Sequence, residues 1–289
     1  MDLPPTTPGV MTDHNSPVNF KAWRPFPSSD PCCASIPHIQ ADNLSIAYKG
    51  HQALKGVNLN IYRGCITALV GPSGSGKTSF LMSINRLTDL IPGCQVTGTL
   101  SLHELNVLSP HIDLLSLRRT VGMIFQKPII FPFSIRKNME LPLREHGQRN
   151  PSFLASSIEK ALQQVGLWSE VKDRLNHPAH TLSGGQQQRL CLARALALSP
   201  DVLLLDEPCS ALDPLSSGIV EDLIASLRGH YTIVIVTHNL AQARRLADHV
   251  AVFWTCEGVG RLVEQGTAQQ IFESPQHELT AAYIAGTRG

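Results

Sequence analysis

The stretch Gly71-Pro72-Ser73-Gly74-Ser75-Gly76-Lys77-Thr78 matches the phosphate-binding pattern G-x-x-x-x-G-K-[ST] at every fixed position. Residues 65–70 before it have the length of a buried strand, and residues 78–84 after it are expected to form a helix. Glycines let successive N–H groups of the loop point inward, and the helix adds the positive end of its dipole. We therefore expect a phosphate-binding loop, with Lys77 at the outer phosphates and Thr78 at a magnesium ion.

The composition indicates a globular protein with enough apolar residues for a large core, since 43% of its 289 residues are hydrophobic. The 24 Lys and Arg nearly balance the 23 Asp and Glu, which argues against nucleic-acid binding and a polybasic membrane anchor. We find neither a run of about 18 apolar residues nor a secretion signal, so membrane contact is expected through protein partners only. Seven cysteines without metal-pair spacing favour a reducing cytosol.

The chain divides into a proline-rich extension and a longer folded part. Residues 1–37 contain eight prolines and few periodic apolar residues, which predicts a disordered extension without chemistry of its own. We expect one domain over residues 38–288, which begins with antiparallel strands at 39–47 and 53–61. Helical spacing from about 134 to 182 predicts a small helical subdomain inserted in an α/β core.

A second candidate anion site follows this helical segment. Ser183-Gly184-Gly185-Gln186 stands directly before a predicted helix, where backbone N–H groups and the Ser183 hydroxyl are available as donors. Two explanations remain open. Either one chain binds two anions, or each nucleotide is shared between the phosphate loop of one copy and this second site of another copy.

Three further predicted strands end in polar side chains, at Gln126, at Asp206-Glu207 and near His238. Ligands of open α/β sheets bind at the carboxyl ends of the strands, so these side chains are candidates for one site. The amide of Gln126 offers a donor and an acceptor that bridge a magnesium ion and an attacking water. Asp206 is expected to hold magnesium, and Glu207 to accept a proton from the water as general base.

Each of these assignments has a structural alternative. One of the two acids at 206 and 207 can cap the following helix, and His238 can be an ordinary structural histidine rather than a γ-phosphate contact. Tyr48, which lies before the phosphate loop, can stack on an adenine ring or simply pack against its own sheet.

Taken in order, the phosphate loop, Gln126, residues 182–186, Asp206-Glu207, residues 210–213 and His238 resemble the nucleotide-binding subunits of ABC transporters. The resemblance covers about residues 38–288. It implies an α/β fold, namely an ABC ATPase cassette with a RecA-like P-loop core, an antiparallel β subdomain and an inserted α-helical subdomain. ATP and Mg²⁺ are the implied cofactors, with Thr78, Gln126 and Asp206 at the metal.

The resemblance also implies how the ATPase assembles. It predicts a head-to-tail homodimer with two ATPs at the interface, each held by one copy's phosphate loop and the other copy's Ser183 and Gly185. Gly184, Gln186 and Asp213 are placed near the nucleotide, and Tyr48 is placed on the adenine. The helical subdomain is expected to dock on two integral-membrane permease subunits.

Residues 85–93, 117–128 and 231–239, and the triple glutamine that follows Gly185, are similar to the ATPases of phosphate importers. This similarity implies a peripheral protein on the cytoplasmic face of the inner membrane, with a phosphate-binding protein as an indirect partner. The chain departs from the pattern at Ile129-Ile130, where the family usually has Asn-Pro, and at Cys209, where threonine is common.

Other functions remain alternatives. An ABC importer ATPase for another cargo has the same motifs, because the cassette never touches the cargo. A soluble ABC protein of translation or DNA repair is disfavoured, since the chain has one cassette and no heptads between the phosphate loop and residue 183. A simple nucleotide kinase leaves residues 183–186 unexplained.

Overall fold

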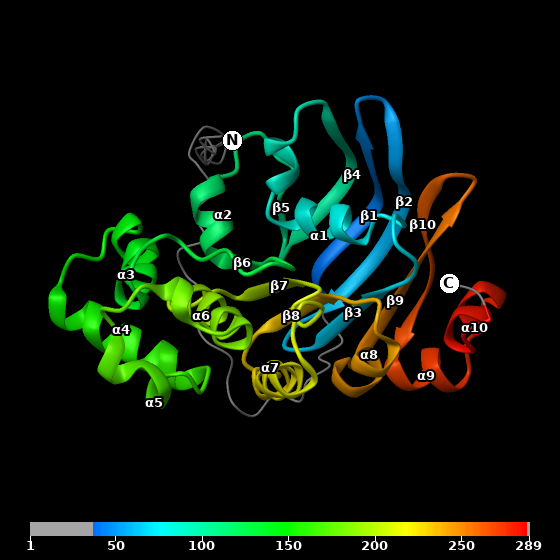
Figure 1. Ribbon diagram of the computed structural model, residues 1–289. Coiled ribbons are helices and arrows are strands. Elements are labelled where there is room, and N and C mark those ends of the chain that lie inside the picture. The colour runs from blue at the N-terminus through cyan, green and yellow to red at the C-terminus, as the bar shows by residue number, and fades with distance from the viewer. Residues whose placement is uncertain (1–36, 288–289) are drawn as a thin grey trace, which may run out of the picture.

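Ten strands form one continuous sheet in the order β5-β4-β1-β2-β10-β9-β3-β8-β7-β6 within residues 37–287, the part of the chain that the computed structural model describes (Figure 1). The predicted extension at residues 1–37 lies outside this part, apart from Pro37, which begins β1. The strands are β1 (Pro37–Tyr48), β2 (His51–Tyr62), β3 (Ile66–Val70), β4 (Cys94–Leu102), β5 (Leu105–Asn106), β6 (Val121–Ile124), β7 (Val202–Asp206), β8 (Thr232–Val236), β9 (His249–Cys256) and β10 (Val259–Thr267).

The sheet has a parallel half and an antiparallel half. Strands β9, β3, β8, β7 and β6 run parallel, whereas β2, β1, β4 and β5 pair antiparallel. Strand β10 joins the halves, since it pairs antiparallel with β9 and parallel with β2. The α/β fold with its antiparallel β region is therefore confirmed.

Within residues 37–287, α-helices cover both faces of the parallel half, and a group of them projects beyond the sheet. They are α1 (Lys77–Ile84), α2 (Leu114–Thr120), α3 (Ile135–Glu145), α4 (Pro151–Gln164), α5 (Trp168–Val171), α6 (Gly184–Leu196), α7 (Pro214–Ser226), α8 (Leu240–Leu246), α9 (Ala268–Glu273) and α10 (Glu278–Ile284). None of the helices in residues 37–287 has both the length and the apolar character needed to cross a membrane.

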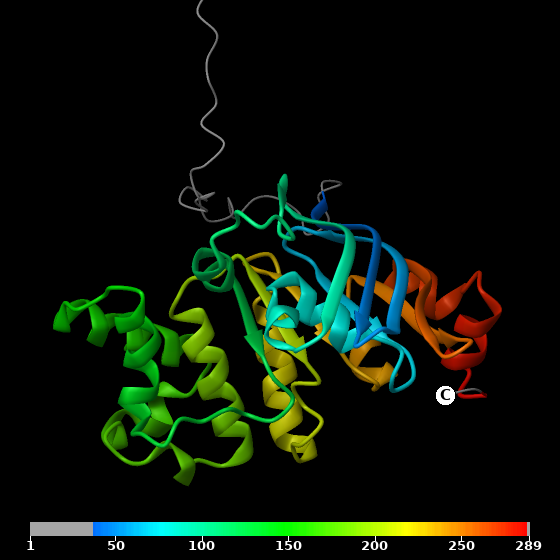
Figure 2. The same ribbon diagram turned by 90° about the horizontal axis from the view of Figure 1, so that it is seen from above.

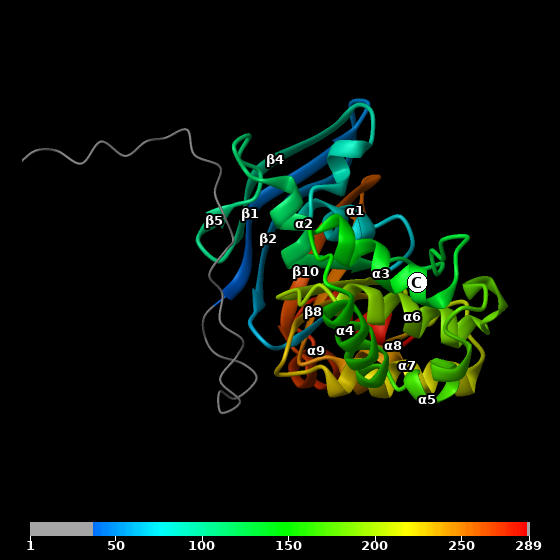
Figure 3. The same ribbon diagram turned by 90° about the vertical axis from the view of Figure 1, so that its left-hand side faces the viewer.

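Two apolar clusters, one on each face of the parallel strands, hold these layers together. One contains α1 between the parallel strands and the antiparallel β1, β2 and β4 (Figure 3). The other packs α6, α7 and α8 on the opposite face and continues into α3 and α4. Every residue of β3 and β8 is buried, as expected for parallel strands covered on both faces.

Helices α3, α4 and α5 form a group that projects from the sheet beside α6 (Figure 2). Side-chain caps define where α3 and α4 begin: the Ser134 hydroxyl accepts from the N–H of Lys137, and Asn150 accepts from two N–H groups at the start of α4. Their apolar faces share one cluster with α6. Because of this packing, the start of α6 is held by the projecting helices as well as by the sheet.

A histidine pair, in which His38 is buried and His103 half-buried, lies where the two halves of the sheet meet. His38 Nδ1 lies 2.6 Å from the Thr232 hydroxyl, and its Nε2 lies 3.1 Å from His103 Nε2. The Thr232 oxygen also accepts from the N–H of Gly64 at 3.0 Å, so Thr232 connects His38 to the turn before β3. Burial, followed by the interactions with His103 and with Arg63, lowers the pKa of His38 to about 3. Burial, followed by the positive charge of Arg63, lowers the pKa of His103 to about 4. Both rings are therefore neutral in the folded protein at neutral pH.

The histidine pair predicts a loss of stability in weak acid. Histidine in an unfolded chain has a pKa near 6.5. Below this pH, His38 is therefore protonated in the unfolded chain but stays neutral in the folded protein. Stability is complete above pH 6.5 and falls as the pH drops, by about 2 kcal/mol at pH 5 for His38 alone. Urea titrations from pH 8 to pH 5 measure this slope. His38→Gln is expected to reduce it, whereas the same change at the exposed His51 is the matched control. An unchanged slope in His38→Gln would show that other groups carry the pH dependence.

Candidate functional site

The predicted phosphate loop connects β3 to α1 and is shaped by close backbone contact. Gly71 has φ +134°, and a Cβ atom there would overlap the carbonyl oxygen of Phe253 on β9. A residue with a side chain fits at position 71 only if the loop or the backbone of β9 moves. The remaining loop residues form its tip and floor: Ser73 and Gly74 are exposed, Ser75 is buried, and Gly76 is the N-cap of α1.

Lys77 lies across the loop rather than out in solvent. Its Nζ donates to the carbonyl oxygens of Gly71 at 2.8 Å and Pro72 at 2.7 Å. Burial lowers its pKa, and the carboxylates of Glu207 and Asp206 partly offset this shift. The ammonium group is thus placed at the loop's centre, opposite two acids, where an anion that enters the loop meets it first.

Thr78 and Asp206 form a pair of oxygens at the first turn of α1. The Thr78 hydroxyl donates to Asp206 Oδ1 at 3.0 Å. Burial, together with the nearby charge of Glu207, raises the pKa of Asp206. A cation bound at this site would lower that pKa again, because it favours the charged carboxylate. Residues 37–287 contain no cluster of three or more His, Cys, Asp and Glu suited to a metal. A hydroxyl and one carboxylate are nevertheless the sparse oxygen set that Mg²⁺ combines with phosphate oxygens and water.

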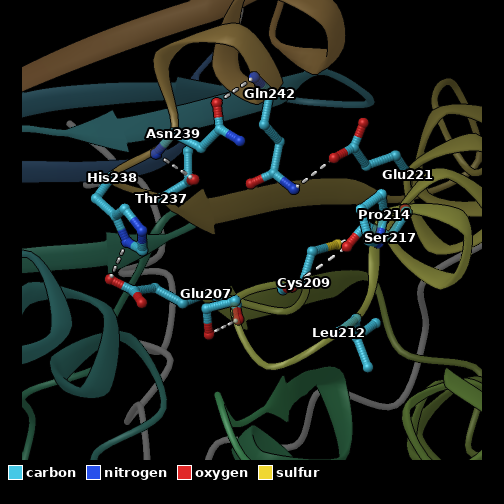
Figure 4. A pocket seen from close by; sticks show the side chains of 11 residues that line it. Glu207, Cys209, Leu212, Pro214, Ser217, Glu221, Thr237, His238, Asn239 and Gln242 are labelled. Carbon is cyan, nitrogen blue, oxygen red and sulfur yellow. Dashed lines mark hydrogen bonds and ion pairs between the residues drawn. The ribbon is translucent and has the colours of Figure 1, made fainter. Parts of the chain in front are cut away.

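Glu207 is held between two side chains that come from other strand ends. Its Oε2 accepts from Gln126 Nε2 at 3.0 Å. Its Oε1 lies 3.1 Å from Nδ1 of His238 (Figure 4). The backbone of Glu207 has φ +45°, an unfavourable conformation that its N–H bond to Val236 helps to maintain. The structure therefore brings together the three residues that we predicted to be catalytic.

Ser210 belongs to this cluster although the sequence did not single it out as a site residue. Its hydroxyl accepts from Gln126 Nε2 at 3.2 Å and donates to the backbone carbonyl of Glu207 at 3.1 Å. The only sequence signal was its position three residues after Glu207, within the motif that ends at Asp213.

A cavity of about 340 Å³ lies beside Glu207 and His238, between the starts of α7 and α8 (Figure 4). On its far wall Gln242 donates to Glu221 at 3.0 Å. Burial raises the pKa of the Cys209 thiol to about 12, so the cysteine that replaces the common threonine is an uncharged wall residue.

The second predicted anion site is formed at the start of α6. The Ser183 hydroxyl accepts from the N–H of Gln186 at 3.3 Å, and the Ser183 N–H donates to Gln186 Oε1 at 3.0 Å, which completes a capping box. Gly184 and Gly185 supply the first two N–H groups of the helix, and a Cβ at Gly185 would lie 2.9 Å from Ser216. These residues make no hydrogen bond in residues 37–287 to the phosphate loop or the Glu207 cluster.

Two further predicted residues occupy supporting positions. Tyr48 ends β1 half-buried, and its hydroxyl bonds Ser79 in the first turn of α1, so it lies beside the phosphate loop. Asp213 is the N-cap of α7, and its Oδ1 accepts from the N–H groups of Leu215 and Ser216. A hydrogen bond from the Ser216 side chain, followed by these backbone bonds, lowers the pKa of Asp213. Within residues 37–287, Asp213 makes no hydrogen bond to the other predicted site residues.

Comparison with known proteins identifies the family to which the chain is similar. A family model described as ABC transporter matches residues 54–210. The phosphate import ATP-binding protein PstB 1 of Nitrosococcus oceani is 57% identical over 90% of this chain and 94% of its own length. PstB 2 of Bacillus subtilis, also a phosphate import ATP-binding protein, is 49% identical over 87% of this chain and 92% of its own length.

Among solved structures, CbiO1 of Clostridium perfringens, part of the ABC transporter complex CbiONQ, superposes with a TM-score of 0.71 at 26% identity. The match covers 82% of this chain and 91% of that one. Because the family model matches more than half of the chain, and a relative named as an ATP-binding import protein is 57% identical over 90% of it, the chain belongs to the ABC transporter family.

Proposed function

We propose that this protein is the ATP-hydrolysing subunit of an ABC importer that couples ATP hydrolysis to the uptake of inorganic phosphate. The chemistry rests on one observation above all, the Glu207 carboxylate fixed between Gln126 and His238 beside the phosphate loop. The cargo rests on the two relatives named as phosphate import proteins, which match almost their whole length.

In this proposal ATP lies in the loop of residues 71–78, with its adenine on Tyr48 and its outer phosphates at Lys77. Lys77 exchanges its two carbonyl bonds for phosphate oxygens, which carry more negative charge. Thr78, Asp206 and Gln126 would hold Mg²⁺, which neutralises charge on the phosphate oxygens when bound. The direct bond between Thr78 and Asp206 supports two of these three ligands.

Glu207 then acts as the general base for the attacking water. The hydrogen bond from Gln126 and the close contact with His238 fix its carboxylate, so little reorientation is needed when the water arrives. Gln126 orients the water, and His238 contacts the γ-phosphate and stabilises its charge. The alternative role for Glu207, a helix cap, is disfavoured because both of its carboxylate oxygens contact side chains.

We propose that two copies assemble head to tail and that Ser183, Gly184, Gly185 and Gln186 of one copy complete the ATP site of the other, with Asp213 at the same interface. The separation of the two anion sites within the described chain supports this sharing. We further propose one ATPase domain over residues 38–288 with a helical subdomain at about 134–182. That subdomain docks on two permease subunits at the cytoplasmic face of the inner membrane, and a phosphate-binding protein delivers the cargo to them.

Two substitutions separate binding from hydrolysis. Lys77→Ala removes the ammonium group from the loop and is expected to abolish ATP binding. Glu207→Gln keeps the shape of the side chain but cannot accept a proton, so it should bind ATP normally and lose at least about 100-fold in turnover. Equilibrium binding of a fluorescent ATP analogue and release of phosphate measure the two steps. Parent-like hydrolysis by Glu207→Gln would contradict the assignment of the base.

The cargo is tested by labelled-phosphate uptake in phosphate-starved source cells, with the native chain replaced by Glu207→Gln and other phosphate systems deleted. Loss of high-affinity uptake is expected, because the mutant occupies the permease without hydrolysing ATP. Lys127→Ala, a change outside the proposed chemistry, is the control for expression. Normal uptake despite an ATPase that is inactive in vitro would assign the importer to another cargo.

A further inference from the structure

We propose that Glu170 is a positioning residue for the part of the ATP site that one copy supplies to the other, and that it acts through Gln186. This inference rests on the head-to-tail assembly proposed above. Glu170 lies on the short helix α5, 16 residues before Gln186 and outside every motif that the sequence analysis used.

The start of α6 must be arranged in one particular way to bind an anion. The Ser183 hydroxyl accepts from the N–H of Gln186, so its proton is left to donate outward. The N–H groups of Gly184 and Gly185 are the first two of the helix, and neither has a partner one turn earlier within the helix. These three donors point at a phosphate only while Ser183 keeps its N-cap conformation.

The side chain of Gln186 holds Ser183 in that conformation, provided that its amide faces the right way. Its Oε1 accepts from the Ser183 N–H at 3.0 Å, and its Nε2 donates to Glu170 Oε2 at 2.7 Å. A flipped amide would set its nitrogen against the N–H of Ser183 and its oxygen against the carboxylate of Glu170. The charge of Glu170 therefore selects the amide orientation that completes the capping box.

Glu170 is itself fixed and kept ionised. Arg189, which is 8% exposed, donates through Nη1 to Glu170 Oε1 at 2.7 Å and to the carbonyl oxygen of Gly166 at 3.0 Å. Hydrogen bonding from Arg189, followed by that from Gln186, lowers the pKa of Glu170. One carboxylate oxygen thus accepts from the arginine and the other accepts from the glutamine. Hydrogen bonds therefore link Arg189, Glu170, Gln186 and Ser183 in that order.

A glutamine in place of Glu170 cannot maintain both bonds. It has one carbonyl oxygen, so its NH₂ group must face either the guanidinium of Arg189 or the NH₂ group of Gln186. Since the second arrangement keeps the bond to the buried arginine, Glu170→Gln is expected to turn the amide of Gln186 and disturb Ser183. The phosphate loop lies elsewhere in the chain and is unaffected.

The experiment uses the full chain with Glu207→Gln, in which ATP is bound but not hydrolysed. Light scattering records the MgATP concentration at half-maximal dimerisation, and a fluorescent ATP analogue records binding to the monomer. Glu170→Gln should raise the first value about tenfold, as expected for the loss of one charge-assisted hydrogen bond. The analogue affinity should stay within about twofold. Glu159→Gln is the matched control, because Glu159 also accepts from a glutamine, Gln163, but on α4 and away from Ser183.

A double-mutant cycle separates positioning from general stability. If Glu170 acts through Gln186, Glu170→Gln should have no further effect on dimerisation once Gln186→Ala is present. An undiminished effect in that background, or a dimerisation midpoint equal to that of the parent, would overturn the inference. Dimerisation absent from the Glu207→Gln parent itself would overturn the head-to-tail assembly, and this inference with it.

Discussion

The position of the Glu207 carboxylate depends on the common register of three parallel strands. Gln126 follows β6, Glu207 follows β7 and His238 follows β8, and the bonds of 3.0 and 3.1 Å between them leave little room for a shift. The pairing of Ile124 with Leu205, and of Leu205 with Ile235, sets these strand ends level. A one-residue slip in any of the three strands would turn the polar group away, because side chains alternate between faces.

Apolar packing maintains this register, whereas polar contacts orient the side chains at the strand ends. Strands β7 and β8 are buried on both faces between the two clusters, so they have no freedom to slide. Against this fixed base, Glu207 tolerates a left-handed backbone and Lys77 tolerates burial among carbonyl groups. Both features cost stability, and both lie where a phosphate and a water are expected to react.

Much of this arrangement was predictable from the sequence because the informative residues are local. The phosphate loop is contiguous, and the acids at 206 and 207 follow directly after four buried apolar residues, so one topological rule brings them together. Helix α2 was not predicted, since its seven residues have neither length nor clear periodicity. The bond between His38 and Thr232 joins positions 194 residues apart, and no local pattern signals it. Glu170 was missed for the same reason: α5 has four residues, and its partners lie on another helix.

The two predicted anion sites differ in the elements that support them, and this difference bears on the proposed function. The phosphate loop and Glu207 stand on the sheet, whose strands are locked by burial on both faces. The start of α6 lies close to α7 at Gly185 and Ser216, but its capping box contacts Glu170 of the projecting helices. A displacement of those helices would therefore change the donors at Ser183 before it reached Glu207. In the proposed head-to-tail pair, a movement of the projecting helices in one copy would first change the contacts between its Ser183 and the phosphates bound by the other copy.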